Sequence, residues 1–328
     1  VDYYTAIGDS DHLVALYEDA LRARPKGESE IELLFQIGMV HWRMRNDAAS
    51  AEEYFRRIRK TFPAHPAALS FYRASCQEQA DFARLLQILL EAQRAAESDD
   101  ERVKFLKEVA EISEEKLHND ERAIEAHKGI LKLRAGDVQA VGQLKRLYEK
   151  TEKWNALIDV LKGEVAAVEE GPARAAVLEE MAAVYRDRLR SEMMVIKTWL
   201  QVLEMDPRHE TAFAALRDVF TQAGRWNDLI ALLGKRAEAT EDVAAKVGLY
   251  REMAAVWTQR LNNLNNAVKP LEMVRQLDPH DKDTIAQLKD IYTRRRAFAD
   301  LYELLAAELP ELGGDERVEQ MVQIAQIA

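Results

Sequence analysis

The sequence predicts an all-α protein built as a solenoid, which is a row of stacked antiparallel helix pairs. Three observations favour this class. The chain of 328 residues matches itself at a spacing of 72 residues. Within each match the apolar residues recur at i, i+3, i+4 and i+7, which places them on one face of a helix. Long stretches consist of Ala, Leu, Glu, Lys, Arg and Gln, and strand-like alternation is rare, so we expect no sheet.

The self-match is clearest in four segments that start 72 residues apart. They begin at Phe82, Trp154, Trp226 and Phe298. A second column of apolar residues agrees in phase and comprises Leu144, Leu216 and Leu288, followed four residues later by Tyr148, Phe220 and Tyr292. In the first block Cys76 stands where the other blocks have this aromatic residue. Because free cysteines are often buried, we interpret Cys76 as a small core residue.

Each 72-residue block is predicted to contain two helix pairs, because helix-breaking residues recur near its middle as well as at its ends. Pro63, Gly136, Pro207 and Pro279 mark the middles. We therefore expect about 18 helices in total. The predicted division is a partial repeat at 1–28, double repeats at 29–100, 101–172, 173–244 and 245–316, and the start of a further repeat at 317–328. Since the self-match runs past both ends, we expect the sequence to be part of a longer array.

The first helix pair of each block resembles the tetratricopeptide (TPR) consensus. That consensus runs through a large residue, Leu, a small residue, an aromatic, Ala, a large or aromatic residue, Ala and Pro. The block 245–316 shows it at Tyr250, Met253, Ala254, Trp257, Ala267, Leu271, Val274 and Pro279, with one extra residue in the loop between the helices. The same columns recur at Leu34, Ile37, Gly38, His41, Ala51, Phe55, Ile58 and Pro63, and at Leu178, Met181, Ala182, Tyr185, Val195, Trp199, Val202 and Pro207.

The resemblance implies a right-handed TPR solenoid that binds a peptide segment or small domain of a protein on its concave surface. The long, paired style is similar to the multi-TPR proteins of bacteria, in which such arrays act as adaptors in motility, envelope or secretion assemblies. The predicted function is therefore a protein-interaction scaffold. Two alternatives stay open: end-to-end self-association within a larger multi-TPR protein, and recruitment of substrate for a catalytic domain that lies elsewhere.

The second pair of each block departs from the consensus, because a basic residue stands where Gly or Ala is expected. This basic column comprises Arg73, Lys145, Arg217 and Lys289. One hypothesis is that it binds an acidic segment of a partner. The alternative, which we favour, is structural: the column pairs with an acidic column formed by Glu108, Glu180 and Glu252, with Gln36 in the first block.

A second candidate site is an apolar stripe on the predicted concave surface. If the TPR alignment holds, Phe35, Met39 and Trp42 face this surface together with Glu32. The matching positions of the next two blocks are polar or small: Lys104, Lys107, Glu111 and Glu114, then Ala176, Glu179, Ala183 and Arg186. The stripe is either a pocket for a hydrophobic side chain of a partner or, as we favour, a packing surface. In the second case it packs against the preceding helix, roughly 11–24, or against repeats that lie outside this sequence.

Composition and motifs argue against several other functions. The net charge of −11 disfavours nucleic acid as the main partner. No nucleotide-binding or hydrolase motif is present, and the seven histidines are scattered, so we expect neither catalysis nor a cofactor or metal. No apolar run reaches the length of a membrane span, so we expect no membrane insertion. A single cysteine suits a reducing compartment, and a cytoplasmic location is the expectation.

Overall fold

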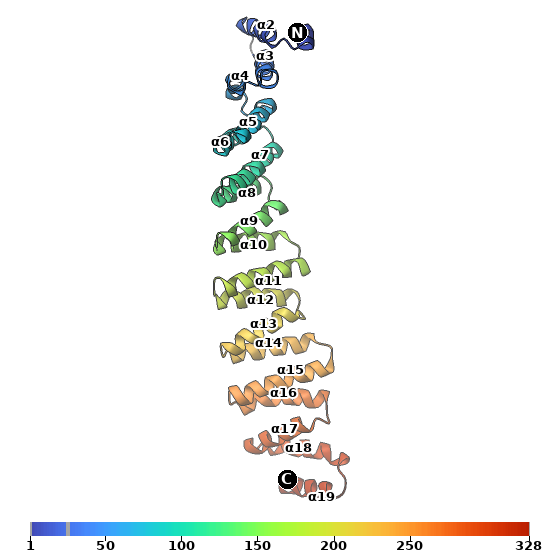
Figure 1. Cartoon of the computed structure of the whole chain (residues 1–328). Helices are drawn as coiled ribbons and strands as arrows, with labels where there is room; N and C mark the ends of the chain where they lie inside the picture. The colour runs from blue at the N-terminus through green and yellow to red at the C-terminus, as the bar shows by residue number, and fades with distance from the viewer. Residues whose placement is uncertain (1, 24–26, 328) are drawn as a thin grey trace. The chain divides into compact units, whose positions relative to one another are not determined.

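The computed structural model describes residues 2–23 and 27–327, and within them every regular element is a helix. Nineteen α-helices are present in this part of the chain, close to the expected number (Figure 1). The all-α prediction is confirmed. The chain forms two compact units, an N-terminal unit of residues 1–163 and a C-terminal unit of residues 164–328.

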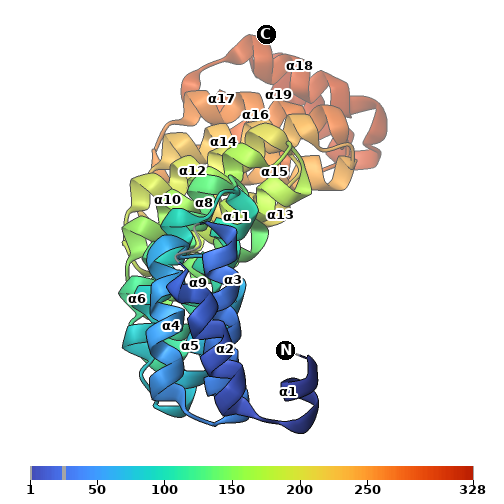
Figure 2. The same cartoon turned by 90° about the horizontal axis from the view of Figure 1, so that it is seen from above.

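The N-terminal unit is a succession of antiparallel helix pairs, in which each helix from α2 to α9 contacts the helix before it in the chain. Figure 2 shows α2, α3 and α4 side by side. The pairs are α1 (Asp2–Ile7) with α2 (Ser10–Arg22), α3 (Glu28–Met39) and η1 (Val40–Met44) with α4 (Ala48–Thr61), α5 (Pro66–Glu78) with α6 (Phe82–Ala95), α7 (Asp99–Glu111) and η2 (Ile112–Lys116) with α8 (Asp120–Leu133), and α9 (Val138–Lys150) with α10 (Trp154–Ala167).

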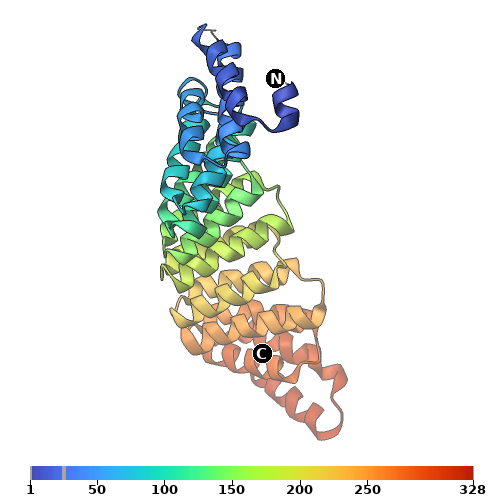
Figure 3. The same ribbon diagram turned by 45° about the horizontal axis from the view of Figure 1, so that its top comes forward.

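The C-terminal unit repeats this arrangement, and Figure 3 shows its pairs in successive layers. The pairs are α11 (Pro172–Asp187) with α12 (Glu192–Met205), α13 (Glu210–Gln222) with α14 (Trp226–Ala239), α15 (Val243–Ala255) and η3 (Val256–Arg260) with α16 (Leu264–Leu277), and α17 (Lys282–Arg295) with α18 (Phe298–Glu308). A short 3-10 turn, η4 (Leu309–Glu311), leads to α19 (Gly314–Ile327).

The extra residue of the TPR-like pairs is taken up at the end of the first helix rather than in an open loop. There the amide of Arg45 donates to the carbonyl of Val40, five residues back, at 3.1 Å, which is a π-helical turn. The same bond recurs from Leu117 to Ile112, from Leu189 to Val184 and from Leu261 to Val256. A residue with left-handed backbone follows each turn: Asn46, His118, Arg190 and Asn262. The wider turn thus recurs at intervals of 72 residues.

The turns inside the other pairs also depend on one left-handed residue. It recurs every 72 residues at Gly8, Ala80, Glu152, Gly224 and Arg296, with φ between 54° and 71°. Glycine adopts this conformation without steric cost, whereas other residues bring Cβ close to the following carbonyl oxygen. Ala80, Glu152 and Arg296 therefore strain the backbone, and Gly224 does not.

Replacing Ala80 with Gly should raise the free energy of unfolding by about 1 kcal/mol, because the left-handed strain of alanine is removed. The matched reverse change, Gly224→Ala, should lower it by about as much. A methyl group on Gly224 meets only Trp226 Nε1, at 3.8 Å, so strain rather than crowding sets that cost. Urea denaturation followed by circular dichroism measures both changes. Effects of the same sign in the two variants would show that the left-handed backbone is not what limits stability at these turns.

The apolar columns found in the sequence form the cores of the helix pairs. Leu144, Leu216 and Leu288 are almost completely buried. Cys76 is 1% exposed, and burial raises the pKa of its thiol. Its interpretation as a core residue is confirmed. In the same block the larger Tyr72 occupies the leucine position and compensates for the small cysteine.

Candidate partner-binding face

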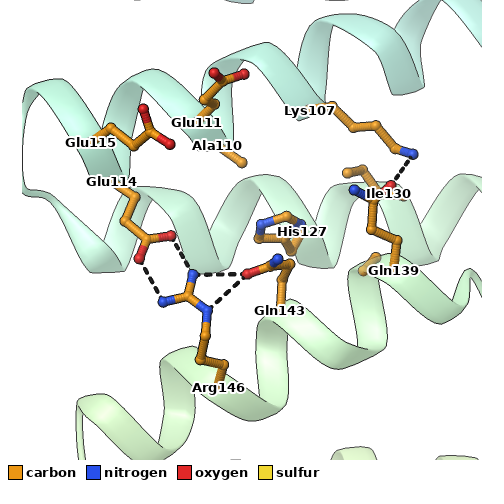
Figure 4. Close-up of a pocket in the computed structure, with 11 residues that line it drawn as sticks. Lys107, Ala110, Glu111, Glu114, Glu115, His127, Ile130, Gln139, Gln143 and Arg146 are labelled. Atoms are coloured by element: carbon orange, nitrogen blue, oxygen red, sulfur yellow. Dashed lines mark hydrogen bonds and ion pairs between the residues drawn. The ribbon is translucent and has the colours of Figure 1, made fainter.

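A polar pocket of about 490 Å³ lies in the N-terminal unit between α7 and α9, with α8 behind it (Figure 4). The first helices of two successive pairs, α7 with its extension η2 and α9, supply most of its walls. The lining residues are Lys107, Ala110, Glu111, Glu114, Glu115, His127, Ile130, Gln139, Ala140, Gln143 and Arg146.

The pocket forms because three aromatic residues of the first block are replaced by polar ones 72 positions later. In the first block Trp42, Phe55 and Phe71 pack together, with ring centroids 4.5 to 6.1 Å apart. The corresponding residues of the second block are Glu114, His127 and Gln143. The His127 column holds Trp199 and Leu271 in the later blocks. The polar side chains leave open the space that aromatic rings fill in the first block.

Hydrogen bonds across the pocket join the first helices of the two pairs. The guanidinium of Arg146 on α9 donates to both carboxylate oxygens of Glu114, at 2.7 and 2.5 Å, and to Oε1 of Gln143. Nζ of Lys107 on α7 donates to Oε1 of Gln139 at 2.7 Å. The Arg146 hydrogen bonds hold the pKa of Glu114 below its ordinary value. Both cations of the pocket are therefore already engaged by protein acceptors (Figure 4).

His127 occupies the centre of this pocket (Figure 4). The residue is only 8% exposed. Its Nδ1 atom makes no hydrogen bond within the described part of the chain. Burial lowers the pKa of the imidazole below its ordinary value, so the ring is neutral at pH 7. A neutral imidazole offers either a donor or an acceptor at Nδ1. The pocket thus contains a buried polar atom whose bonding capacity is unused.

The predicted apolar stripe lies in the first block, at the position equivalent to this pocket. Phe35, Met39 and Trp42 are half-buried and pack against the buried cluster that contains Phe55 and Phe71. The indole of Trp42 meets both phenyl rings edge-on. These ring contacts are with α4 and α5, whereas the packing interpretation named the preceding helix. A role of the stripe in partner binding stays a prediction.

The four residues of the predicted basic column are all half-buried, and three of them have ion pairs inside one unit. Arg73 donates twice to Glu108, at 2.7 Å, and Arg217 lies 4.0 Å from Glu252. Lys289 pairs instead with Glu308, at 2.6 Å. Lys145 lies on α9. The first two pairs have the geometry that the structural interpretation expects, and partner binding by the column stays a prediction.

The Arg73–Glu108 and Arg217–Glu252 pairs should differ in their coupling energy. For Arg73 and Glu108 we expect about 0.5–1 kcal/mol, because two parallel hydrogen bonds join partly screened groups. For Arg217 and Glu252, separated by 4.0 Å, we expect a coupling near zero. Double-mutant cycles to alanine in urea denaturation measure both values. Equal couplings would contradict the assignment of the difference to hydrogen-bond geometry.

The helix pairs carry the TPR-like residue columns in their cores. In α3 and α4 the buried positions include Leu34, Ile37, Ala51, Phe55 and Ile58. The α11–α12 pair buries the same columns, and α15–α16 buries its second-helix columns at Ala267, Leu271 and Val274. Antiparallel pairs with these columns at their contacts define the architecture. Within each unit the fold is that of a TPR-like solenoid.

No family model matches the chain, and none of the curated proteins matches it. Solved TPR structures are similar to it at low sequence identity. Naa15/Naa10 bound to HypK-THB is 13% identical with a TM-score of 0.33; the match covers 99% of this chain and 54% of that one, so the chain spans about half its length. The C-terminal part of a TPR repeat-containing protein from Cytophaga hutchinsonii is 14% identical, with a TM-score of 0.32. The match covers 77% of this chain and 99% of that one. YrrB, described as a TPR protein with an unusual peptide-binding site, is 12% identical, with a TM-score of 0.29. The match covers 62% of this chain and 96% of that one.

The sequence analysis of the TPR columns missed His127, although a signal for it was present. The column that holds Phe55, Trp199 and Leu271 has a polar residue only in the second block. Within residues 2–23 and 27–327, no three His, Cys, Asp or Glu side chains are grouped to hold a metal ion. In the same residues no helix has the length and apolar character that a membrane crossing requires.

Proposed function

We propose that this TPR solenoid is a scaffold that holds a segment of a partner protein on the face formed by the first helices of successive pairs. The observation that carries the proposal is the polar pocket between α7 and α9, with the unused Nδ1 of His127 at its centre. A volume of about 490 Å³ lies within the range of ligand-binding pockets. Groups fixed by hydrogen bonds between two helices are preorganised for recognition, because little further ordering is needed on binding.

Binding is a better account of the pocket than catalysis. Its lining contains no hydroxyl or thiol side chain that could act as a nucleophile. Glu114 is held as a carboxylate by Arg146, which leaves it poorly suited to donate or accept a proton near pH 7. The remaining groups can orient a bound segment by hydrogen bonds and charge.

Position-specific photocrosslinking in the source cells tests the scaffold proposal. A benzophenone amino acid in place of Lys104, which is exposed on α7 one helical turn before Lys107 of the pocket, should give a discrete crosslinked partner. The matched control replaces Glu125, which is exposed on α8 outside the pocket lining. Identical adducts from both positions, or adducts from position 125 alone, would contradict a partner site on the first-helix face.

A second candidate function, self-association, has support in the C-terminal unit. Val318, Met321 and Val322 of α19 are 60%, 52% and 51% exposed and follow the i, i+3, i+4 spacing of one helix face. Such a face favours contact with another helix, for example from a second copy. Sedimentation over a concentration series should show association that Val322→Glu abolishes, and a monomer at all concentrations would refute it.

A further inference from the structure

The positive side chains of the pocket have hydrogen-bond partners within the protein, whereas two of its carboxylates form no ion pair in the described part of the chain. Its two cations, Lys107 and Arg146, already donate to Gln139, Glu114 and Gln143, as described above. Glu111 and Glu115, by contrast, are exposed at its rim and form no ion pair in the described part of the chain. Both lie on one helical turn of α7 and η2, four residues apart. The unused electrostatic capacity of the pocket is therefore negative.

Below this acidic rim the pocket has an apolar floor. Ala110, Ile130 and Ala140 line it and are buried. A lysine or arginine side chain combines a hydrocarbon stem with a cationic head, so its stem gains from apolar contact while its head requires acceptors. An apolar floor with carboxylates above it matches both parts of such a side chain. A simple acidic surface would match only the head.

His127 adds an acceptor in the wall of the pocket, where Nδ1 is buried until the imidazole turns toward a bound group. Since burial keeps the imidazole neutral, its Nδ1 can accept a hydrogen bond from an ammonium or guanidinium group in the tautomer that carries the proton on Nε2. A hydrogen bond from a cation is stronger than one between neutral groups. Accepting it would also satisfy the one buried lining atom that has no partner in the described structure.

We propose that the pocket is selective for a basic side chain, lysine or arginine, of the partner segment, with the cationic head held by Glu111, Glu115 and His127. This inference rests on the scaffold function proposed above. An acidic side chain would have to draw Arg146 from Glu114 or Lys107 from Gln139, and it would face two uncompensated carboxylates. The geometry therefore assigns the pocket to a cation.

A displayed library of random twelve-residue peptides is the probe that tests this assignment. Selection on the full chain, with counter-selection on the His127→Leu variant, should enrich peptides that share one Lys or Arg. Replacing that residue by Gln in the tightest-binding peptide should weaken binding about tenfold or more, and so should the double variant Glu111→Gln/Glu115→Gln in the protein. The control variant Glu149→Gln removes an exposed carboxylate of α9 outside the pocket lining and should leave the affinity within about twofold.

The outcomes separate this inference from the scaffold proposal. Peptides whose binding depends on His127 but that share an acidic or apolar residue would overturn the cation assignment and leave the scaffold proposal standing. Basic peptides that bind the pocket variants as tightly as the wild type would overturn the assignment as well, since their attraction would reflect only the net negative charge. A selection that yields no peptide sensitive to His127→Leu would count against both proposals.

Discussion

Replacing Phe55 with Ala should lower the free energy of unfolding by about 3–5 kcal/mol. Phe55 is completely buried in the first TPR pair, where its ring stacks on Phe71 at 4.5 Å and meets the edge of Trp42. The side chain also fills the space over Gly38, since a methyl group there would come within 3.1 Å of the phenyl ring. Truncation removes apolar contact with three neighbours and leaves a cavity that the flanking helices close only in part.

Phe62 provides the matched control at the end of the same helix. It directly follows α4 and is 49% exposed, so Phe62→Ala should change the free energy of unfolding by less than about 0.5 kcal/mol. Urea denaturation of both variants followed by circular dichroism makes the comparison. Comparable losses in the two variants would show that the aromatic cluster of the first block is not a major source of stability.

The His127→Leu variant should be more stable than the wild type by about 1–3 kcal/mol, because it removes a buried nitrogen without a hydrogen-bond partner. The same chain provides a precedent for leucine at this position. Leu271 occupies this column in the last full block, where it is buried in one cluster with Ala254, the counterpart of Ala110. Leucine therefore fits without overpacking. The control His127→Asn keeps a polar side chain and should bring no gain. A less stable His127→Leu variant would mean that the imidazole is satisfied in solution.

The advantage of His127→Leu should grow as the pH falls. Burial lowers the pKa of His127 below its ordinary value of 6.5, so between these two values the unfolded chain binds more protons than the folded chain. The stability that depends on the neutral ring is thus present above pH 6.5 and is lost as the pH falls through the folded pKa. Burial also lowers the pKa of His41 and His65, so the variant should keep part of this acid sensitivity. A pH-independent difference between melting temperatures of the two proteins would contradict this account.

The helix pairs were predictable because their information is local and repeated. An apolar period of one helix face, with breakers at fixed intervals, specifies where each helix begins and which face it buries. The form of the turns was less accessible. The extra residue was visible in the sequence, but a wider loop and a π-helical turn at Val40 have the same length, and the choice depends on backbone hydrogen bonds to carbonyls in the preceding turn.

The candidate site was predicted only in part, because it depends on contacts between helices that are distant in sequence. The stripe at Trp42 was recognised, but its contact with Phe71 requires the position of α5. The pocket needs Glu114, His127 and Gln143 to be polar together, and these residues come from three segments. Each substitution alone looks like ordinary variation in a TPR column. Only the fact that the three polar residues line one pocket distinguishes them from such variation.

A partner segment that occupies the pocket around His127 should change the signals of this histidine ring. NMR of the full chain labelled with ¹⁵N-histidine measures them directly. The probe is the tightest-binding selected peptide, added to saturation. The signals of the His127 ring nitrogens should shift on binding, whereas those of His209, at the start of α13 in the C-terminal unit, should not. A saturated complex in which the His127 signals stay unchanged would contradict this occupation of the pocket.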